Sequence, residues 1–537
     1  MTAVGHVAVS RRWRRLTWGL MLALALHVLH GFDEHTLSND EPVQHSYGQL
    51  LLDFHASGFT DLRAFDYVNL HLYGGLFDLV AALLEPVPPL SAWDLRHLLT
   101  GLIGLAGCWA AALVARQLGG DRAAALTLAG LALTGAWSGA LFTHTKDIPF
   151  ATAMTWALFF NTRLMKELAT VPWPRPRWST ALGWGAATGC ALGLRVGGLF
   201  AIGYIGLGLL VLAWQQGPSL RDLLLGLRRL WPAAGAALLL ALLLMAVAWP
   251  WAVSGPDHLW QAATRFSHFS FGLRTVFNGE ALWIADVPRS YLPHYLAVRL
   301  PELVLAGLLA GAALWLAGLA HRRRLPSVAP AWWPLGIACA FPLLLAVSTR
   351  PALYNGLRHF TFLLPPLVIL AALGWDRLWN WAASTRGPAT SVVAAAALLL
   401  ALPAAWRLAA LHPYEYVAYN VIAGGARGAQ DRYEMDYWSD GLREAAGLLN
   451  DLAAREPPPA GRHYRVAVCA EPLQLVTYLD PRLRGTRDWS KADFFVASTT
   501  ENCDSAVPGP VSMRIVRAGA TLMVVKDLRA IRARGTQ

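Results

Sequence analysis

The stretch FTHTKDIPFATAMTW, residues 142–156, joins two long apolar runs and sets an adjacent cation and anion between them. The run LTLAGLALTGAWSGALF leads into the charged pair, Lys146 and Asp147, and ATAMTWALFF follows it. His144 lies just before the pair. Charge at the edge of a bilayer is costly and usually has a partner. The pattern fits a connecting loop in which Asp147 caps the next helix, and it also fits a functional site that faces one side of a membrane.

The composition of the chain favours a membrane protein. Of its 537 residues, 55% are hydrophobic and 15% are charged, whereas soluble domains carry about 25% charged residues. Apolar runs of about 20 residues recur, and a helix of that length crosses ~30 Å of hydrocarbon. The net charge of +11 comes from short basic clusters between these runs, a pattern typical of cytoplasmic loops. We therefore expect a polytopic α-helical membrane protein and no nucleic-acid partner.

The basic clusters also predict a topology. If all of them are cytoplasmic, an even number of crossings must separate each pair. The segment 69–84 would break this parity if it crossed, so we expect it to lie on the outer face as an interfacial helix. About eleven spans then follow, near residues 16–31, 92–115, 123–142, 148–167, 179–194, 196–215, 231–252, 302–320, 331–348, 359–375 and 390–410. The N-terminus is expected in the cytoplasm, and Asp40, Asp147, Arg195, Arg358 and the chain after 411 on the outer face.

The chain changes character after the last span. Polar helical stretches alternate with short β-like runs, namely YRVAVCA, ADFFVAS, SMRIV and TLMVV. This predicts a transmembrane domain over residues 1–410 and a small periplasmic α/β domain over 411–537. Cys469 and Cys503 lie in the second domain and could pair in an oxidising compartment; the sequence leaves that pairing open.

Two acidic sites fall on the predicted outer face. The first is the adjacent pair Asp40 and Glu41 in SNDEPVQHSYG, and the second is Asp147. A carboxylate can accept a proton from an incoming hydroxyl or ligate a metal. A solvated loop is the alternative for the first pair.

Cations are expected on the same face. Arg195 is flanked by glycines that leave room for a bulky group, and Arg358 and His359 stand at the mouth of a span. Arginine binds phosphate through charge-assisted hydrogen bonds, although anchoring at the interface is an alternative. Acids and cations on one face suit group transfer from a lipid-phosphate donor, because the departing phosphate needs positive charge or a metal near its oxygen.

The motifs together resemble a known family. The Asp40–Glu41 pair, followed by the Lys–Asp pair of THTKDIPFA, resembles membrane glycosyltransferases of the GT-C class. Within that class the resemblance is to bacterial family 39-like proteins, related to protein O-mannosyltransferases and to the lipid A aminoarabinose transferase. LRHFTFLLPP and HPYEYVAYNVIAGGARGAQDRYEMDYW, residues 412–438, are similar to segments of the same group. The likeness runs from about residue 38 to 445. His144 and Thr145 replace the usual Asn-Pro, which leaves the shape of that loop open.

The resemblance implies an enzyme of the bacterial inner membrane. It would be a hexosyl- or pentosyltransferase that moves a sugar, with inversion, from a polyprenyl-phosphate donor to a periplasmic lipid, glycan or protein. Asp40 would be the base with Glu41 assisting, and Asp147 would be the second acid. The candidates for binding the donor are Lys146, His144, Arg195, Arg358 and His359. The cofactor is undetermined, and a divalent metal ion is one candidate.

Two other classes of function stay open. A lipid or solute transporter predicts inverted repeats and charges near the middle of the membrane, whereas the charges here are expected at outer helix ends. A membrane-anchored binding or assembly protein has no need for acids in two outer loops. Neither the sugar nor the acceptor can be read from the sequence.

Overall fold

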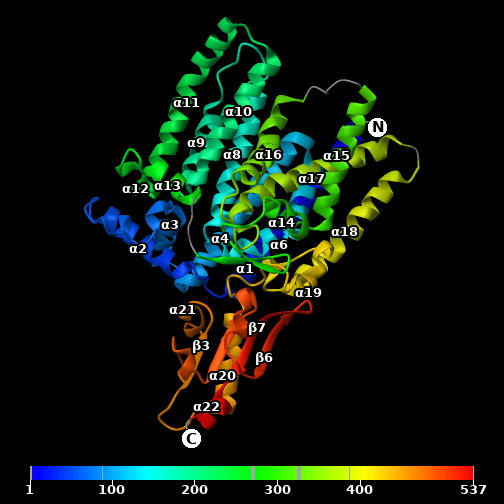
Figure 1. Cartoon of the computed structure of the whole chain (residues 1–537). Coiled ribbons are helices and arrows are strands. Elements are labelled where there is room, and N and C mark those ends of the chain that lie inside the picture. Colours follow the sequence, from blue (N-terminus) through cyan, green and yellow to red (C-terminus); the bar gives the residue numbers. More distant parts are fainter. Residues whose placement is uncertain (1–2, 88, 268–271, 323–327, 386, 536–537) are drawn as a thin grey trace.

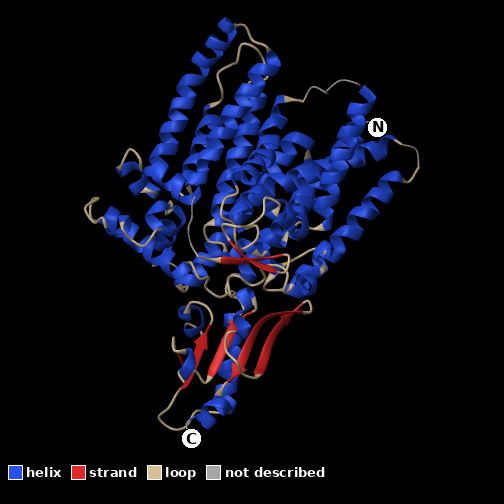
Figure 2. Ribbon diagram, viewed as in Figure 1, coloured by secondary structure: helices blue, strands red, loops and turns tan. Residues whose placement is uncertain are grey.

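The fold consists of a large bundle of helices with a mixed β-sheet below it (Figures 1 and 2). The computed structural model describes residues 3–87, 89–267, 272–322, 328–385 and 387–535. Helices cover each of the eleven ranges that the sequence predicted as spans: α1 (Ala3–Gly31), α4 (Ala92–Gly119), α5 (Asp121–Leu133) with α6 (Gly135–Ser138) and α7 (Ala140–Thr143), α8 (Asp147–Glu167), α9 (Trp178–Leu192), α10 (Leu199–Gln216), α11 (Leu220–Ala248), α15 (Glu302–Arg322), α16 (Trp333–Thr349), α17 (Leu364–Ser384) and α18 (Ala389–Leu411).

Among the described residues, seven helices are long and apolar enough to cross a membrane. An eighth span results if α5 and the short helices that follow it, bent by 74°, count as one. The protein is thus a multi-pass membrane protein, and the number of eleven crossings stays a prediction.

Local sequence explains where several helices begin. Ser91 caps α4 by accepting a hydrogen bond from the amide of Asp94 at 3.1 Å, and Ser219 caps α11 in the same way. α17 has proline in its first turn, where the fixed φ suits a helix and the missing N–H is not needed. The bend after α5 coincides with glycines: a Cβ at Gly139 would lie 2.1 Å from the backbone nitrogen of Tyr416. The bend therefore lets the segment after α18 pack against the bundle.

The segment between α1 and α4 contains short helices, as expected for an interfacial region. These are α2 (Glu41–Ala56), η1 (Arg63–Phe65), η2 (Leu70–Leu72) and α3 (Leu76–Leu84). Nine residues of α3 extend about 14 Å, less than half of the ~30 Å needed to cross. The amide of Leu76 donates to Gly193 at 2.9 Å, and a Cβ at Gly74 would lie 2.1 Å from that same carbonyl oxygen. A glycine is needed here because α3 is held directly against the end of α9.

A second connection, between α11 and α15, also consists of short elements. It holds α12 (Pro250–Ser254), α13 (His258–Ser267), the hairpin of β1 (Arg274–Phe277) and β2 (Glu280–Trp283), and α14 (Tyr291–Arg299). Between α18 and the C-terminal sheet lie η6 (Glu415–Val417), η7 (Val421–Ala423) and α19 (Gly425–Ala429). This second stretch packs against the bundle, since Tyr416 and Val417 are fully buried and the amide of Asn420 donates to Val298 at 3.0 Å.

The C-terminal sheet has five strands in the order β4-β3-β5-β7-β6. β3 (Tyr464–Val468) runs parallel to β4 (Leu483–Gly485) and β5 (Phe494–Ser498), whereas β7 (Ala520–Asp527) runs antiparallel to β5 and β6 (Val511–Arg517). The helices of this region are α20 (Leu442–Arg455), α21 (Pro472–Val476) and α22 (Arg529–Gly535). Cys469 and Cys503 form a disulfide, the pairing that the sequence left open. The α/β character of this region is confirmed, and the domain boundary at residue 411 stays a prediction.

Candidate active site

Two carboxylates that are far apart in the sequence meet at one guanidinium. Arg358, at the start of the 3₁₀ helix η5 (Arg358–Leu363), donates to Asp40 and, through Nε, to Asp147 at 3.3 Å. Arg195 donates to the other carboxylate oxygen of Asp147 at 2.5 Å. We call these four residues the shared-arginine cluster. All of them were proposed from the sequence, and the structure brings them together.

The members of this cluster differ in exposure. The side chain of Asp40 is 39% exposed, whereas that of Asp147 is 3% exposed. Asp147 is the first residue of α8, whose N-cap position is Lys146 and has no side-chain cap hydrogen bond. The capping role considered for Asp147 is therefore wrong: its carboxylate is bound by two arginines. Asp40 is the acid that solvent can reach.

Lys146 turns away from its neighbour Asp147 into a second group of charges. Its Nζ lies 3.5 Å from Asp78 and 4.9 Å from the centre of the Tyr73 ring. Asp78 also accepts a hydrogen bond from Arg96 at 2.8 Å. Burial lowers the pKa of Lys146, while the nearby Asp78 and Asp40 oppose that shift. In the described part of the chain, Nζ of Lys146 has no hydrogen-bond acceptor, and Asp78 is its ion-pair partner.

Glu41 belongs to this second group and not with Asp40. Its carboxylate lies 3.3 Å from His97 and 3.6 Å from Arg96, and it accepts a hydrogen bond from the amide of Ser38 at 2.6 Å. Burial raises the pKa of Glu41, but these three contacts together outweigh burial, and the net shift is downward. We call Glu41, Arg96, Asp78 and Lys146 the sealed cluster. The structure does not bring Glu41 to the acid that it was expected to assist.

The two histidines proposed from the sequence lie beside Arg358. Trp438 donates to Nε2 of His144 at 3.3 Å, so this nitrogen is an acceptor and the ring proton resides on Nδ1, next to Thr143. Burial, followed by the charges of Arg358, Arg299 and Arg195, lowers the pKa of His144 well below its usual value. His144 is thus neutral and does not supply positive charge to a phosphate. His359 packs edge-on against Tyr354, with ring centres 4.7 Å apart.

Sequence reasoning missed Trp438 and Arg96. The indole of Trp438 lies 4.1 Å from the guanidinium of Arg358 and covers it. Arg96 links Glu41 with Asp78 at the centre of the sealed cluster. Trp438 lies within the segment 412–438 that was singled out by resemblance, whereas nothing in the local pattern of α4 marks Arg96.

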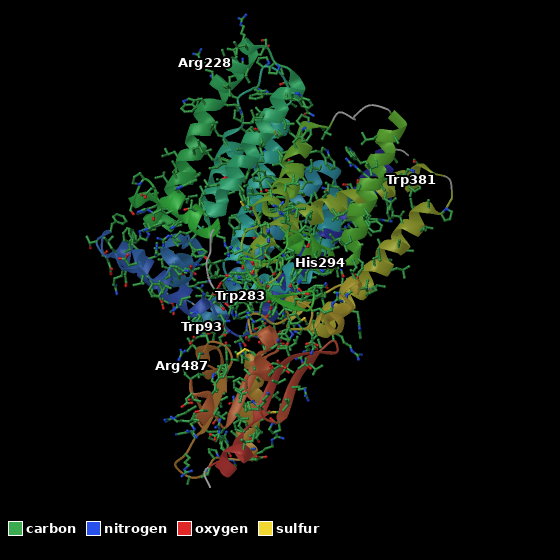
Figure 3. All side chains as sticks on the ribbon, in the orientation of Figure 1. Trp93, Arg228, Trp283, His294, Trp381 and Arg487 are labelled. Carbon is green, nitrogen blue, oxygen red and sulfur yellow. A yellow bond between two sulfur atoms is a disulfide. The ribbon has the colours of Figure 1, made fainter. Side chains whose placement is uncertain are left out.

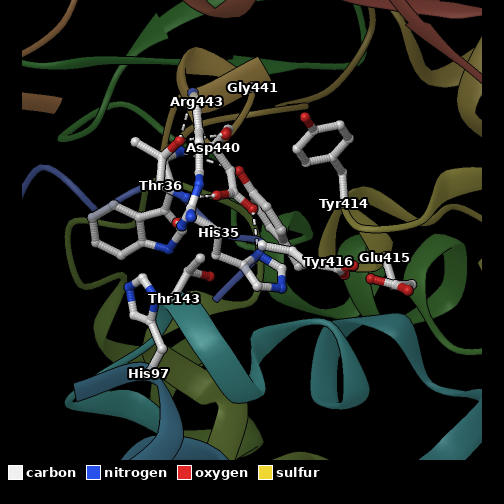
Figure 4. A network of polar contacts seen from close by, with 12 residues as sticks. His35, Thr36, His97, Thr143, Tyr414, Glu415, Tyr416, Asp440, Gly441 and Arg443 are labelled. Carbon is white, nitrogen blue, oxygen red and sulfur yellow. Dashed lines mark hydrogen bonds and ion pairs between the residues drawn. The ribbon is translucent and has the colours of Figure 1, made fainter. Parts of the chain in front are cut away.

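A further polar network fixes the chain on both sides of the site (Figure 4). Asp440 accepts hydrogen bonds from His35 and from the amide of Thr36, each at 2.7 Å. The amide of Arg443 donates to the hydroxyl of Thr36 at 2.8 Å. The loop that leads to Asp40 is thereby attached to the segment that carries Trp438. Both segments are buried here, so their relative position is set by specific hydrogen bonds.

A metal site does not emerge from the arrangement of donors. Among the described residues, no three His, Cys, Asp or Glu side chains are grouped so that they could hold a metal ion. Asp40 and Asp147 are each bound by arginine. The divalent metal ion considered from the sequence therefore stays a prediction.

Comparisons with known proteins give similarities in structure alone. No family model and no curated protein matches the chain. The solved structure of ArnT from Cupriavidus metallidurans bound to undecaprenyl phosphate is similar with a TM-score of 0.46 and 19% identity, over 98% of each chain. The structure of the oligosaccharyltransferase of Archaeoglobus fulgidus is similar with a TM-score of 0.48 and 13% identity, over 84% of this chain and 62% of the other. The structure of the arabinofuranosyltransferase AftD from Mycobacteria is similar with a TM-score of 0.42 and 16% identity, over 96% of this chain and 40% of the other.

Proposed function

We propose that the protein is an inverting glycosyltransferase of the GT-C class that uses a polyprenyl-phosphate-linked sugar as donor. The observation that carries this proposal is the shared-arginine cluster, in which a half-exposed acid and a buried acid bind the same guanidinium. The cluster provides a base for the acceptor hydroxyl and positive charge for the departing phosphate. Both lie at helix ends, where a lipid tail can stay in the bilayer while its headgroup reacts.

The donor phosphate takes the place of Asp40 on Arg358. Arg358 then donates to the phosphate, and the buried Asp147 holds Arg358 and Arg195 in position. Lys146 stays in the sealed cluster beside Asp78 and is not needed to bind the phosphate in this scheme. Asp147 is a positioning residue in this scheme, because its oxygens are occupied by the two arginines.

Asp40, once released from Arg358, acts as the general base. It accepts the proton of the acceptor hydroxyl while the hydroxyl oxygen attacks the anomeric carbon. The bond between that carbon and the phosphate oxygen breaks, and the polyprenyl phosphate leaves with its negative charge stabilised by arginine. Attack opposite the leaving group inverts the configuration. The same chemistry serves a hexose or a pentose, and a lipid, glycan or protein acceptor.

The placement of these groups also favours an enzyme over the two alternatives. Asp147 and Arg358 lie at the beginnings of α8 and η5, and Arg195 follows the end of α9. These charges are not at mid-helix, where a transporter would need them. A binding protein would not need a half-exposed acid that shares an arginine with a buried acid. The proposal places the site on the periplasmic face of a bacterial inner membrane, with the N-terminus in the cytoplasm and residues 411–537 outside.

The test is release of polyprenyl phosphate by the purified protein from a panel of polyprenyl-phosphate sugars, with a cell-envelope lipid extract as acceptor. Asp40→Asn is expected to lower turnover by about 10²- to 10⁴-fold, because an amide cannot accept the hydroxyl proton. Asp53→Asn is the matched control. Asp53 lies on α2, the helix that follows Asp40, in an exposed pair with Arg63, and its variant should change turnover less than about twofold. Equal turnover by the two variants would remove Asp40 as the base, and no release by the wild type from any donor would refute the function.

A further inference from the structure

A groove lies between α15, α17 and the start of α16, away from the shared-arginine cluster. Its volume is about 470 Å³, within the range of roughly 300–1,000 Å³ that holds small ligands. Its walls are almost wholly apolar and include Leu308, Trp315, Trp332 and Leu370. The groove opens to the side of the bundle, where Ala312 and Trp315 are exposed.

Among the described residues that line this groove, one is a cation. Arg377 is exposed, and its guanidinium stacks on the ring of Trp332 at 4.4 Å. In the described ranges Arg377 has no carboxylate within ion-pair distance. The carboxylate of its neighbour Asp376 pairs with Arg122 instead, at 2.7 Å. An apolar groove with a cation among its described lining residues complements a ligand with an anionic head and an apolar tail.

The groove is remote from the candidate active site. Arg358 precedes the first residue of α17, Leu364, whereas Arg377 lies ~13 residues into that helix, a rise of about 20 Å. A helix that crosses the bilayer carries these two arginines toward opposite faces. The donor that reacts at Arg358 consequently does not reach Arg377 with its phosphate.

We propose that the groove binds an anionic phospholipid of the membrane leaflet opposite the active site. One acyl chain lies between α15 and α17, and the phosphate pairs with Arg377. Basic pockets between membrane helices bind anionic headgroups in this way. The lipid fills a lateral opening between helices, so its effect is on the stability of the bundle and not on the chemical step.

The test uses the full-length protein in detergent and native mass spectrometry with added phosphatidylglycerol or phosphatidylcholine. The wild type is expected to bind phosphatidylglycerol about tenfold more tightly, since only that headgroup leaves its phosphate charge unneutralised. Arg377→Gln should abolish the preference, and Arg377→Lys should retain most of it. Ala312→Phe, which places a ring in the groove, should weaken the binding of both lipids.

Arg228→Gln is the matched control. Arg228 is an exposed arginine of α11 at the end of the bundle far from the sheet (Figure 3), and it does not line the groove. This variant should bind both lipids as the wild type does. If Arg228→Gln lost the preference for phosphatidylglycerol as fully as Arg377→Gln, the proposed site would be wrong. It would also be wrong if the wild type bound phosphatidylglycerol and phosphatidylcholine equally. Tighter binding of polyprenyl phosphate than of phosphatidylglycerol at this groove would also overturn it, because the groove would then hold the donor.

Discussion

Each of the two charge clusters contains one residue from the pair Asp40–Glu41 and one residue from the pair Lys146–Asp147. Asp40 and Asp147 belong to the shared-arginine cluster, whereas their neighbours Glu41 and Lys146 belong to the sealed cluster. The side chain of Asp40 is 39% exposed and that of Glu41 is fully buried. Adjacent residues thus lie in different surroundings. We propose that the shared-arginine cluster exchanges a partner with a ligand and that the sealed cluster stabilises the fold.

Breaking the sealed cluster should have the largest effect. Arg96→Met leaves Glu41 and Asp78 buried without their shared cation, and removing one partner of a buried pair costs about 3–5 kcal/mol. Thermal unfolding in detergent should show this loss. The folded fraction should still bind polyprenyl phosphate, because Arg358 is untouched. If Arg96→Met unfolded at the wild-type temperature but no longer bound polyprenyl phosphate, the sealed cluster would bind the donor and would not stabilise the fold, contrary to our assignment.

Removing Arg358, the arginine shared by the two acids, should have the second-largest effect. Arg358→Ala is expected to weaken binding of polyprenyl phosphate by about 10- to 100-fold, because a charge-assisted hydrogen bond is worth roughly 1.5–3 kcal/mol. Arg358→Lys should recover part of the affinity, since lysine keeps the charge and lacks the planar fork. Isothermal titration measures both variants. Unchanged affinity in the two would show that the donor phosphate binds elsewhere.

Replacing Trp438, which lies over Arg358, should have a smaller effect on donor affinity. Trp438→Leu removes an indole that lies 4.1 Å from Arg358 and also the hydrogen bond to His144. A cation–π contact of this kind is worth about 0.5–2 kcal/mol, so we expect donor affinity to fall by about three- to tenfold. Trp406→Leu is a suitable control, because Trp406 is 75% exposed on α18. The same loss in the control would mean that Trp438 only contributes apolar surface.

The helices could be predicted because each depends on its own local pattern. Apolar runs of about 20 residues suffice to place a membrane helix, and helices cover all eleven predicted ranges. Four β-like runs likewise became β3, β5, β6 and β7. The fifth strand, β4, spans only Leu483–Gly485, too short to show an alternating pattern.

The candidate site could be predicted only in part, for a physical reason. Asp40, Asp147, Arg195 and Arg358 could be selected because each is a charge on the predicted outer face of a chain with only 15% charged residues. Which of them pair is set by how the loops pack, and no local pattern records it. The sequence could not reveal that Glu41 would turn toward Arg96, or that Trp438 would cover an arginine 80 residues earlier.

The central claim is that Asp40 and the donor phosphate compete for Arg358, and one binding measurement tests it directly. The dissociation constant of polyprenyl phosphate should be measured by titration calorimetry for the wild type and for Asp40→Asn. Our account predicts two- to fivefold tighter binding by the variant, because a partly exposed ion pair worth up to about 1 kcal/mol no longer has to be broken. Equal or weaker binding by Asp40→Asn would contradict the account, since Asp40 would then not be the group that the phosphate displaces.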